Sequence, residues 1–322
     1  MIDKFFSKEK TVVNERRATV IKTNFPLSLR DTLECGQCFR HELICESDDG
    51  YAEYLIPVGT TLINVAQRAL GELIFFEGDD PDFDKTFEEV IRPYFTLDTD
   101  YKGICADIIE RTDSQWLKRA ARVGEGIAIL KQDEWEAIFS FIVSQNNNIP
   151  RIRKIIRQLS AAYGVNISLQ NGASLCPANR IDTPPCEEKC RECGVCYTFP
   201  NAADVAREPE KMLPSRPGFR FKYLLDAAER VTSGELDLKE IFDTHTYRYT
   251  VERLKTVKGV GDKVASCAAL FGFANLEAFP IDVWMRRAID EYFGGNLDPE
   301  TLGDYAGLAQ QYIFHYIRNI EK

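Results

Sequence analysis

Long apolar runs are absent from this sequence. No stretch of the 322 residues reaches the about 20 apolar residues that a membrane-spanning helix requires. Residues 1–10, MIDKFFSKEK, lack the apolar core of a secretory signal, and no internal repeat indicates a solenoid. We therefore expect an intracellular protein that is not inserted in a membrane, cytoplasmic and associated with the nucleoid if it is bacterial.

An excess of positive charge is absent as well. The 40 Lys and Arg residues are outnumbered by 50 Asp and Glu residues, which gives a formal net charge of -10. This balance disfavours binding to a polyanion such as DNA unless the charges are segregated. Acid is concentrated at 46–49 and 77–84, whereas the run at 151–157 has no acidic residue. The basic residues in question are Arg151, Arg153, Lys154, Arg157, Arg216, Arg220, Lys222, Lys255, Lys258, Arg286 and Arg287. The sequence predicts a basic face on an acidic body, and charges scattered over solvated faces are the alternative.

The hydrophobic pattern changes its period along the chain. The short runs before residue 78, separated by Gly and Asp, are typical of strands in an antiparallel sheet; they lie at 18–22, 37–44, 51–57, 60–65 and 72–76. After Pro81 apolar residues recur at three- and four-residue steps, as in helices. We expect an α+β fold with two domains: an antiparallel β-rich domain at 1–98 and a mostly helical, two-part domain at 99–322.

A glycine turn between two helical patterns lies late in the chain. Residues 255–257 close one helical pattern, KGVG at 258–261 forms a tight turn, and Asp262 starts a second apolar helix. This is a helix-hairpin-helix motif. Gly259 and Gly261 allow a ligand to approach the backbone closely, and the N–H groups that begin the second helix suit a phosphate. The expected ligand is a DNA backbone.

Lys263 and Asp282 are the candidate catalytic pair. Lys263 lies in the first turn of the second helix, where the helix dipole and Lys258 disfavour a charged ammonium, and a neutral amine is a nucleophile. The helix carries the chain away by about 15 Å, and residues 274–281 can span at most about 26 Å back, so Asp282 can return beside Lys263. Singly, a solvated lysine and an N-capping aspartate are the simpler interpretations. Their combination with the hairpin favours catalysis.

Five segments together resemble the 8-oxoguanine DNA glycosylase/AP-lyase family of the helix-hairpin-helix glycosylase superfamily. The hairpin segment at 254–287 resembles the family's catalytic core, and FSFIVSQNNNIPRI at 139–152 resembles its asparagine-rich DNA-contact loop. GQCFR at 36–40 resembles its pocket motif, GFRFKY at 218–223 its wedge segment, and AGLAQQYIF at 306–314 the segment that holds the base. The resemblance spans most of the chain and implies a base excision repair enzyme.

The resemblance implies a set of contacts to base and DNA. The backbone carbonyl of Gly36 would accept the N7 hydrogen that distinguishes 8-oxoguanine from guanine, Gln310 would pair with the base edge, and Phe314 would stack on it. Cys267 would complete the pocket; a turn glycine and ordinary core side chains are the alternative interpretation. The implied DNA contacts are Asn146, Asn148, Arg151, Phe219, Arg220, Gly259, Gly261, Trp284 and Arg286.

Individual DNA contacts carry specific expectations. Arg151 and Arg220 would read the orphaned cytosine, because arginine offers paired donors for cytosine's acceptors. Phe219 would act as the wedge; the family commonly has tyrosine there, so a hydroxyl contact is lost. Trp284 replaces an expected histidine, which puts one phosphate contact in doubt. For the asparagines, a turn or a helix cap is the alternative role.

The implied reaction is base excision followed by strand cleavage. Lys263 would attack the sugar C1′ as the damaged base leaves, while Asp282 stabilises developing positive charge. The resulting Schiff base acidifies the C2′ proton, so β-elimination cleaves the strand 3′ to the lesion. This chemistry needs no cofactor. A glycosylase for another damaged base, or a non-enzymatic DNA-binding protein, are the competing functions; damaged duplex DNA is the expected partner, and a monomer is the default.

Four cysteines form a separate cluster. Cys186, Cys190, Cys193 and Cys196 follow one another closely in PPCEEKCRECGVCYTF. This density in an intracellular chain favours a structural zinc ion or an iron–sulfur cluster over disulfides, with Cys176 as a spare ligand. The segment, about 176–198, looks like an insertion, and a reduced thiol-rich loop is the alternative. The pair at 35 and 38 overlaps the pocket motif, so we expect it to bind no metal.

Overall fold

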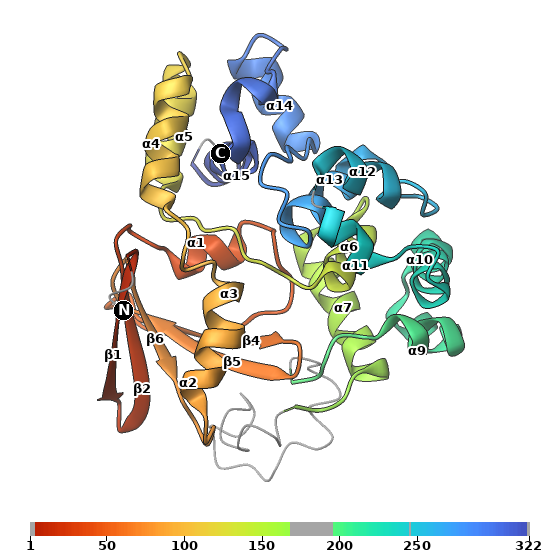
Figure 1. Cartoon of the computed structure of the whole chain (residues 1–322), viewed down its shortest axis with the longest axis horizontal. Helices are drawn as coiled ribbons and strands as arrows, with labels where there is room; N and C mark the ends of the chain where they lie inside the picture. The colour runs from red at the N-terminus through yellow and green to blue at the C-terminus, as the bar shows by residue number, and fades with distance from the viewer. Residues whose placement is uncertain (1–3, 168–195, 245, 321–322) are drawn as a thin grey trace.

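The computed structural model describes residues 4–167, 196–244 and 246–320 (Figure 1). An N-terminal sheet lies against a larger helical part, and no helix in these ranges is long and apolar enough to cross a bilayer. One hydrophobic core runs without interruption from the sheet into the helices. The predicted α+β fold is confirmed.

The sheet has six strands, all antiparallel, in the order β1-β2-β6-β5-β4-β3. Their bounds are β1 Phe6–Val13, β2 Arg16–Thr23, β3 Glu42–Glu46, β4 Ala52–Val58, β5 Thr61–Gln67 and β6 Glu72–Phe76. Successive side chains of a strand point to opposite faces of the sheet. Tyr54 and Val65 therefore enter the main core, and Leu55 and Leu62 enter a smaller cluster on the other face. Both faces of β4 and β5 are therefore covered.

Four of the five predicted strands are present within two residues of their predicted ends. The prediction of a strand at 37–44 was wrong in its first half, because Gln37 is fully buried and bonds to other backbone segments instead of a strand ladder. Strand β1 was not predicted, since FSKEKTVV is an edge strand whose side chains are mostly exposed. Helix α1, Leu29–Glu34, was also missed, although Ser28 caps it by accepting from the backbone N–H of Asp31.

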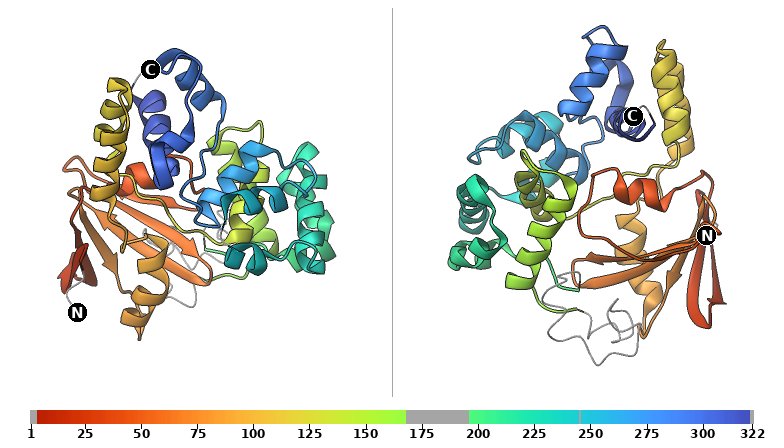
Figure 2. Two further views of the ribbon diagram at one scale, coloured as in Figure 1. Left: turned by 45° about the horizontal axis from the view of Figure 1, so that its top comes forward. Right: turned by 180° about the vertical axis from the view of Figure 1, so that it is seen from behind.

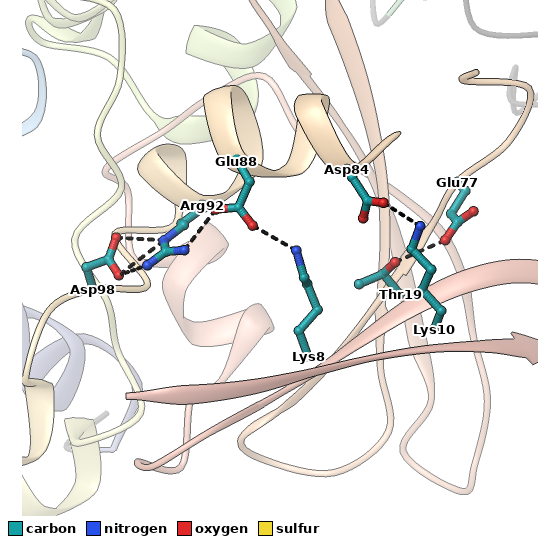
Figure 3. A network of polar contacts seen from close by, with 8 residues as sticks. All are labelled: Lys8, Lys10, Thr19, Glu77, Asp84, Glu88, Arg92 and Asp98. Carbon is teal, nitrogen blue, oxygen red and sulfur yellow. Dashed lines mark hydrogen bonds and ion pairs between the residues drawn. The ribbon is translucent and has the colours of Figure 1, made fainter. Parts of the chain in front are cut away.

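The acidic segment after the sheet is partly neutralised by the edge strand. Three short helical pieces, α2 Phe83–Thr86, η1 Phe87–Ile91 and α3 Arg92–Tyr94, pack on the sheet through Phe87, whose ring meets that of Phe75 at 6.0 Å. Figure 3 shows Lys8 and Lys10 of β1 reaching Glu88 and Asp84 at 2.7 and 2.6 Å. The acid concentrated here therefore lies on the sheet side of the molecule. The domain boundary at residue 98 stays a prediction.

The helices form two groups in Figures 1 and 2. One group, beside α1, consists of α4 Tyr101–Arg111, α5 Gln115–Gly124, α14 Val283–Tyr292, η6 Pro299–Tyr305 and α15 Ala306–Asn319. The other consists of α6 Glu134–Ser144, α7 Ile149–Tyr163, α9 Ala202–Arg207, η4 Pro209–Ser215, η5 Gly218–Arg220, α10 Phe221–Ser233, α11 Leu238–Thr244, α12 Tyr247–Leu254 and α13 Asp262–Phe271. The chain passes from the second group back to the first between α13 and α14.

Gln37 fixes the segment that joins α1 to the sheet. Its side-chain amide donates to the carbonyls of Thr32 and Ala128, both at 2.8 Å, and its carbonyl accepts from the Leu130 backbone N–H at 2.8 Å. Because a buried amide with all these bonds has one favoured position, the neighbouring Gly36 is held in place between the sheet and the helices.

Candidate active site

A cavity of about 630 Å³ lies where the sheet domain and both helix groups meet. It takes residues from the 35–39 segment, from the end of α6 and the loop after it, and from α7, α13, α14 and α15. Its lining includes Gly36, Ser144, Gln145, Lys263, Cys267, Asp282, Trp284, Gln310, Gln311 and Phe314. The two predicted catalytic residues and all four predicted pocket residues therefore line one cavity.

The helix-hairpin-helix motif is present where the glycines predicted it. Helix α12 ends at Leu254, and α13 begins at Asp262 with Gly261 as N-cap. Gly259 has φ +76°, and a Cβ there would lie 2.4 Å from the ring of Tyr223 on α10. Both the left-handed backbone and the contact with this ring therefore require glycine at 259.

Lys263 reaches the cavity from the first turn of α13. Its ammonium nitrogen Nζ lies 3.4 Å from the Ser144 hydroxyl, to which it donates a long hydrogen bond, and 5.3 Å from the centre of the Phe141 ring. The Lys263 side chain has no ion-pair partner among the described residues, because the acidic residue next to it, Asp262, pairs with Lys255 at 2.5 Å instead. The amine is thus held loosely at the cavity wall and is available for a ligand.

Asp282 caps α14 and also lines the cavity. As N-cap of α14, its Oδ1 accepts from the backbone N–H groups of Trp284 at 3.0 Å and Met285 at 2.9 Å. The same carboxylate lines the cavity. The cap fixes the side-chain rotamer and uses one oxygen, so the other can act on a ligand beside Lys263.

Cys267 lies one helical turn after Lys263 and is buried. Burial raises the pKa of the thiol; the positive charge of Lys263 opposes this shift and the negative charge of Asp282 adds to it. The thiol therefore stays neutral and acts as a small apolar wall of the cavity rather than as a nucleophile.

Gly36 and Phe314 lie close to each other in the cavity wall. Gly36 has φ +87°, and a Cβ there would lie 3.6 Å from Ile149 Cδ1 and 3.8 Å from Phe314 Cε1. These are ordinary contacts, so it is the left-handed backbone that calls for glycine. The half-buried Phe314 ring lies 5.7 Å from the Arg318 guanidinium, and both residues line the cavity.

The asparagine loop between α6 and α7 forms one rim of the cavity. Asn148 caps α7 by accepting from the Arg151 backbone N–H at 3.0 Å, and Asn147 donates to the carbonyl of Val143 at 3.2 Å. Asn146 is exposed and has φ +47°, a conformation that asparagine tolerates. The turn and cap roles that were the alternative for these residues are thus real, and Asn146 has the side chain most available to a ligand.

Arg220 holds the asparagine loop through the backbone carbonyls of the loop. Its guanidinium is buried, donates to the carbonyls of Gln145 at 2.9 Å and Asn146 at 3.0 Å, and lies 4.4 Å from the Phe219 ring centre. Burial and the nearby charge of Arg151 lower its pKa. Phe219 itself is 48% exposed. The two residues lie behind the rim rather than in the cavity.

The four basic residues of α7 have different surroundings. Arg153 and Arg157 face the sheet domain, where both pair with Glu42 and Arg153 also donates to the His41 carbonyl. Arg151 and Lys154 line a separate hollow of about 300 Å³ together with Arg216. Lys154 also lines another hollow with Arg153 and Arg157, so two of the four basic charges of α7 are paired with Glu42 and the predicted basic face stays a prediction.

Three residues of the cysteine cluster lie outside the described residues: Cys186, Cys190 and Cys193. The spare ligand Cys176 also lies outside them. Cys196 is described and is buried beside Leu55, Leu62 and Tyr197. Within the described ranges no group of three or more His, Cys, Asp or Glu side chains could hold a metal. Burial raises the pKa of Cys35 to about 12 and that of Cys38 further, so both stay protonated.

The two remaining predicted DNA contacts are Trp284 and Arg286. Trp284 lines the cavity and Arg286 is exposed on α14.

Three residues at or near the site were not predicted from the sequence: Ser144, Gln311 and Asp226. Gln311 carried a readable signal, since a polar side chain at a core-facing position of an apolar helix is unusual.

The comparisons with known proteins agree with this geometry. The family model described as 8-oxoguanine DNA glycosylase, N-terminal domain, matches residues 19–138. The structure of MBOgg1 in complex with a low affinity DNA ligand is 30% identical, covers 98% of this chain and 99% of that chain, and has a TM-score of 0.78.

Two further relatives agree with it. The Clostridium acetobutylicum 8-oxoguanine glycosylase/lyase, in complex with duplex DNA containing cytosine opposite 8-oxoG, is 27% identical with a TM-score of 0.79, over 99% of both chains. The N-glycosylase/DNA lyase of Saccharomyces cerevisiae is 27% identical over 277 residues, 81% of this chain and 67% of that protein. The chain belongs to the 8-oxoguanine DNA glycosylase family.

Proposed function

We propose that this protein is a bifunctional DNA glycosylase that excises 8-oxoguanine opposite cytosine and cleaves the strand through a Lys263 Schiff base. The observation that carries the proposal is that Lys263 and Asp282 line one cavity with Gly36 and Phe314. The relatives support it, because one of them is an 8-oxoguanine glycosylase/lyase bound to a duplex with cytosine opposite the lesion.

The cavity suits a flipped purine. An enzyme that acts on a base must take it out of the stack, and a site of about 630 Å³ can enclose one base with its sugar. The Phe314 face stacks on the base, and Cys267 gives an apolar wall. The Gly36 carbonyl accepts the N7 hydrogen of 8-oxoguanine and rejects guanine, whose N7 is itself an acceptor.

Lys263 supplies the nucleophile. Its amine lone pair forms the bond to C1′ while the bond from C1′ to the base nitrogen breaks and that electron pair leaves with the base. The Asp282 carboxylate stabilises the positive charge that develops at C1′, and its cap on α14 keeps it oriented. The alkylated amine passes one proton to the departing base, and its freed lone pair then expels the ring oxygen, which takes a proton from water, to give the protonated Schiff base. Loss of the C2′ proton then expels the 3′ oxygen.

The DNA is bound around this cavity. The hairpin N–H groups at Gly259 and Gly261 take a phosphate at the start of α13, and Asn146 and Asn148 lie on the rim toward the opposite strand. Phe219 fills the gap that the flipped base leaves. Arg151 reads the unpaired cytosine, and Arg220 supports it by holding the loop carbonyls of Gln145 and Asn146. Trp284 and Arg286 lie along the damaged strand.

The chemistry uses no cofactor. Cys186, Cys190, Cys193 and Cys196 are proposed as a structural metal site, since four thiolates suit tetrahedral zinc and iron–sulfur clusters alike. Metal analysis of the purified protein, with a Cys190→Ser variant as control, tests this part. A monomer located inside the cell completes the proposal, and sedimentation measures the oligomeric state.

A panel of lesion duplexes tests the function. The expected result is strand cleavage of 8-oxoguanine opposite cytosine at least about tenfold faster than cleavage of duplexes with an alkylated purine or an oxidised pyrimidine. Faster cleavage of another lesion would move the assignment to a different glycosylase, and binding without any cleavage would indicate a DNA-binding protein.

A further inference from the structure

Two adjacent glutamines of α15 line the cavity, and only one of them was predicted to bind the base. Gln310 and Gln311 are each 4% exposed, on a helix stretch that is otherwise apolar. Burial of an amide is unfavourable unless each polar atom finds a partner. Two neighbouring buried amides at a cavity wall therefore need an explanation beyond packing.

The hydrogen bonds of this pair are incomplete. The Gln311 amide nitrogen donates to the Gln310 carbonyl oxygen at 2.7 Å. The Gln311 oxygen Oε1 is buried and has no hydrogen-bond partner among the described residues. A buried acceptor that lacks a partner in the ligand-free protein, in a residue that lines the cavity, is suited to an N–H donor on the ligand.

We propose that Gln311 is a second base-recognition residue, whose Oε1 accepts a hydrogen from the exocyclic 2-amino group of the flipped base next to the contact made by Gln310. The inference rests on the proposed glycosylase function. A guanine-type base carries two adjacent donors on this edge, the N1–H and the 2-amino group, and two adjacent amides can serve both. Adenine-type bases lack both donors, so this arrangement also disfavours them.

The bond between the two amides adds to this discrimination. With its oxygen engaged by Gln311, the Gln310 side chain cannot turn freely, so both amides are ordered before the base arrives. In the observed orientation Gln311 donates to Gln310, which leaves the free acceptor on Gln311. A purine without the 2-amino group leaves a buried acceptor unsatisfied, which penalises that substrate.

A two-by-two experiment tests the proposal. Wild type and Gln311→Met are each assayed under single-turnover conditions with 8-oxoguanine and with 8-oxohypoxanthine, which lacks only the 2-amino group, both opposite cytosine. In wild type we expect loss of the amino group to slow excision about tenfold, and in Gln311→Met we expect less than about a threefold difference. The exposed Gln115→Met on α5 is the matched control and should behave as wild type.

The ratio of the two rates is independent of how much of the variant is folded, because both substrates meet the same preparation. An unchanged ratio in Gln311→Met would overturn the role of Gln311 while leaving the glycosylase function intact. Absence of excision of 8-oxoguanine by wild type would instead overturn the proposed function, and the recognition proposal with it. Equal rates on both substrates in wild type would show that the 2-amino group is not read.

Discussion

The carboxylate of Asp226 on α10 accepts a hydrogen bond from the Lys258 backbone N–H at 2.9 Å and pairs with the Lys258 ammonium at 3.1 Å. Asp226 thereby fixes the hairpin turn to the helix whose first residues follow Phe219 and Arg220. The hairpin and the wedge segment, far apart in sequence, are held in one arrangement by this buried side chain.

We predict that Asp226→Asn lowers the free energy of unfolding by about 1–3 kcal/mol at pH 7. Burial opposes ionisation of Asp226, but hydrogen bonds from Lys258 and Arg230 outweigh it and lower its pKa. A carboxyl with a lowered folded-state pKa stabilises the protein above its unfolded pKa of about 3.9 and loses that contribution as pH falls through the folded value. Urea unfolding across pH should show the difference between wild type and variant shrinking below about pH 4. Asp243→Asn, which breaks an exposed pair with Lys239, should cost much less, and an equal cost would contradict the account.

We predict that Gly259→Ala is more damaging than Gly234→Ala. Both glycines have positive φ, +76° and +79°, so both substitutions carry similar backbone strain. A Cβ at 234 meets nothing within 4 Å, whereas one at 259 meets the Tyr223 ring at 2.4 Å and must displace it. Thermal unfolding should show an additional loss of about 1–3 kcal/mol for Gly259→Ala, together with weaker DNA binding. Equal effects of both variants would show that the ring contact is unimportant.

Two substitutions at Asp282 should separate its helix cap from its chemistry. Asn preserves an oxygen that can accept from Trp284 and Met285 but removes the charge, so we expect little change in stability and a loss of at least about 100-fold in the excision rate. Ala removes both, and should cost about 1 kcal/mol of stability in addition. Normal activity of Asp282→Asn, measured by single-turnover excision, would leave the residue with a structural role only.

The division of the α7 arginines predicts different salt responses. Arg151→Ala should weaken DNA binding and reduce the slope of log affinity against log salt by about 1, because its exposed guanidinium neutralises DNA phosphate charge in addition to contacting the cytosine. Arg157→Ala should leave that slope unchanged and lower stability instead, since Arg157 pairs with Glu42. Binding titrations at several salt concentrations measure the slope for both variants. A reduced slope for Arg157→Ala would place DNA on the sheet side of α7.

The features predictable from sequence were those with local causes. The KGVG turn permits few conformations, so the hairpin followed from its glycines and from the apolar helix after them. The return of Asp282 toward Lys263 followed from chain length alone, and the structure places both in one cavity. Strands β2, β4, β5 and β6 followed from short β-like runs separated by Gly and Asp.

The features missed depend on partners far away in sequence. Gln37 interrupts a strand pattern because its bonds go to residues 128 and 130, which no local pattern shows. Arg157 pairs with Glu42, 115 residues earlier, and the basic run at 151–157 by itself does not show this partner. In the sequence, Asp226 is an ordinary carboxylate on a helix. Its contacts with Lys258 become visible only when α10 packs against the hairpin.

The most direct test of the central claim is borohydride trapping of the Schiff base on a duplex with one 8-oxoguanine opposite cytosine. Wild type and the control Lys239→Gln, an exposed lysine on α11, should each give a covalent protein–DNA complex and a nicked strand. Lys263→Gln should give neither. Trapping by Lys263→Gln at the wild-type level would assign the nucleophile to another residue, and base release by wild type without trapping would show hydrolytic chemistry in place of the lysine mechanism.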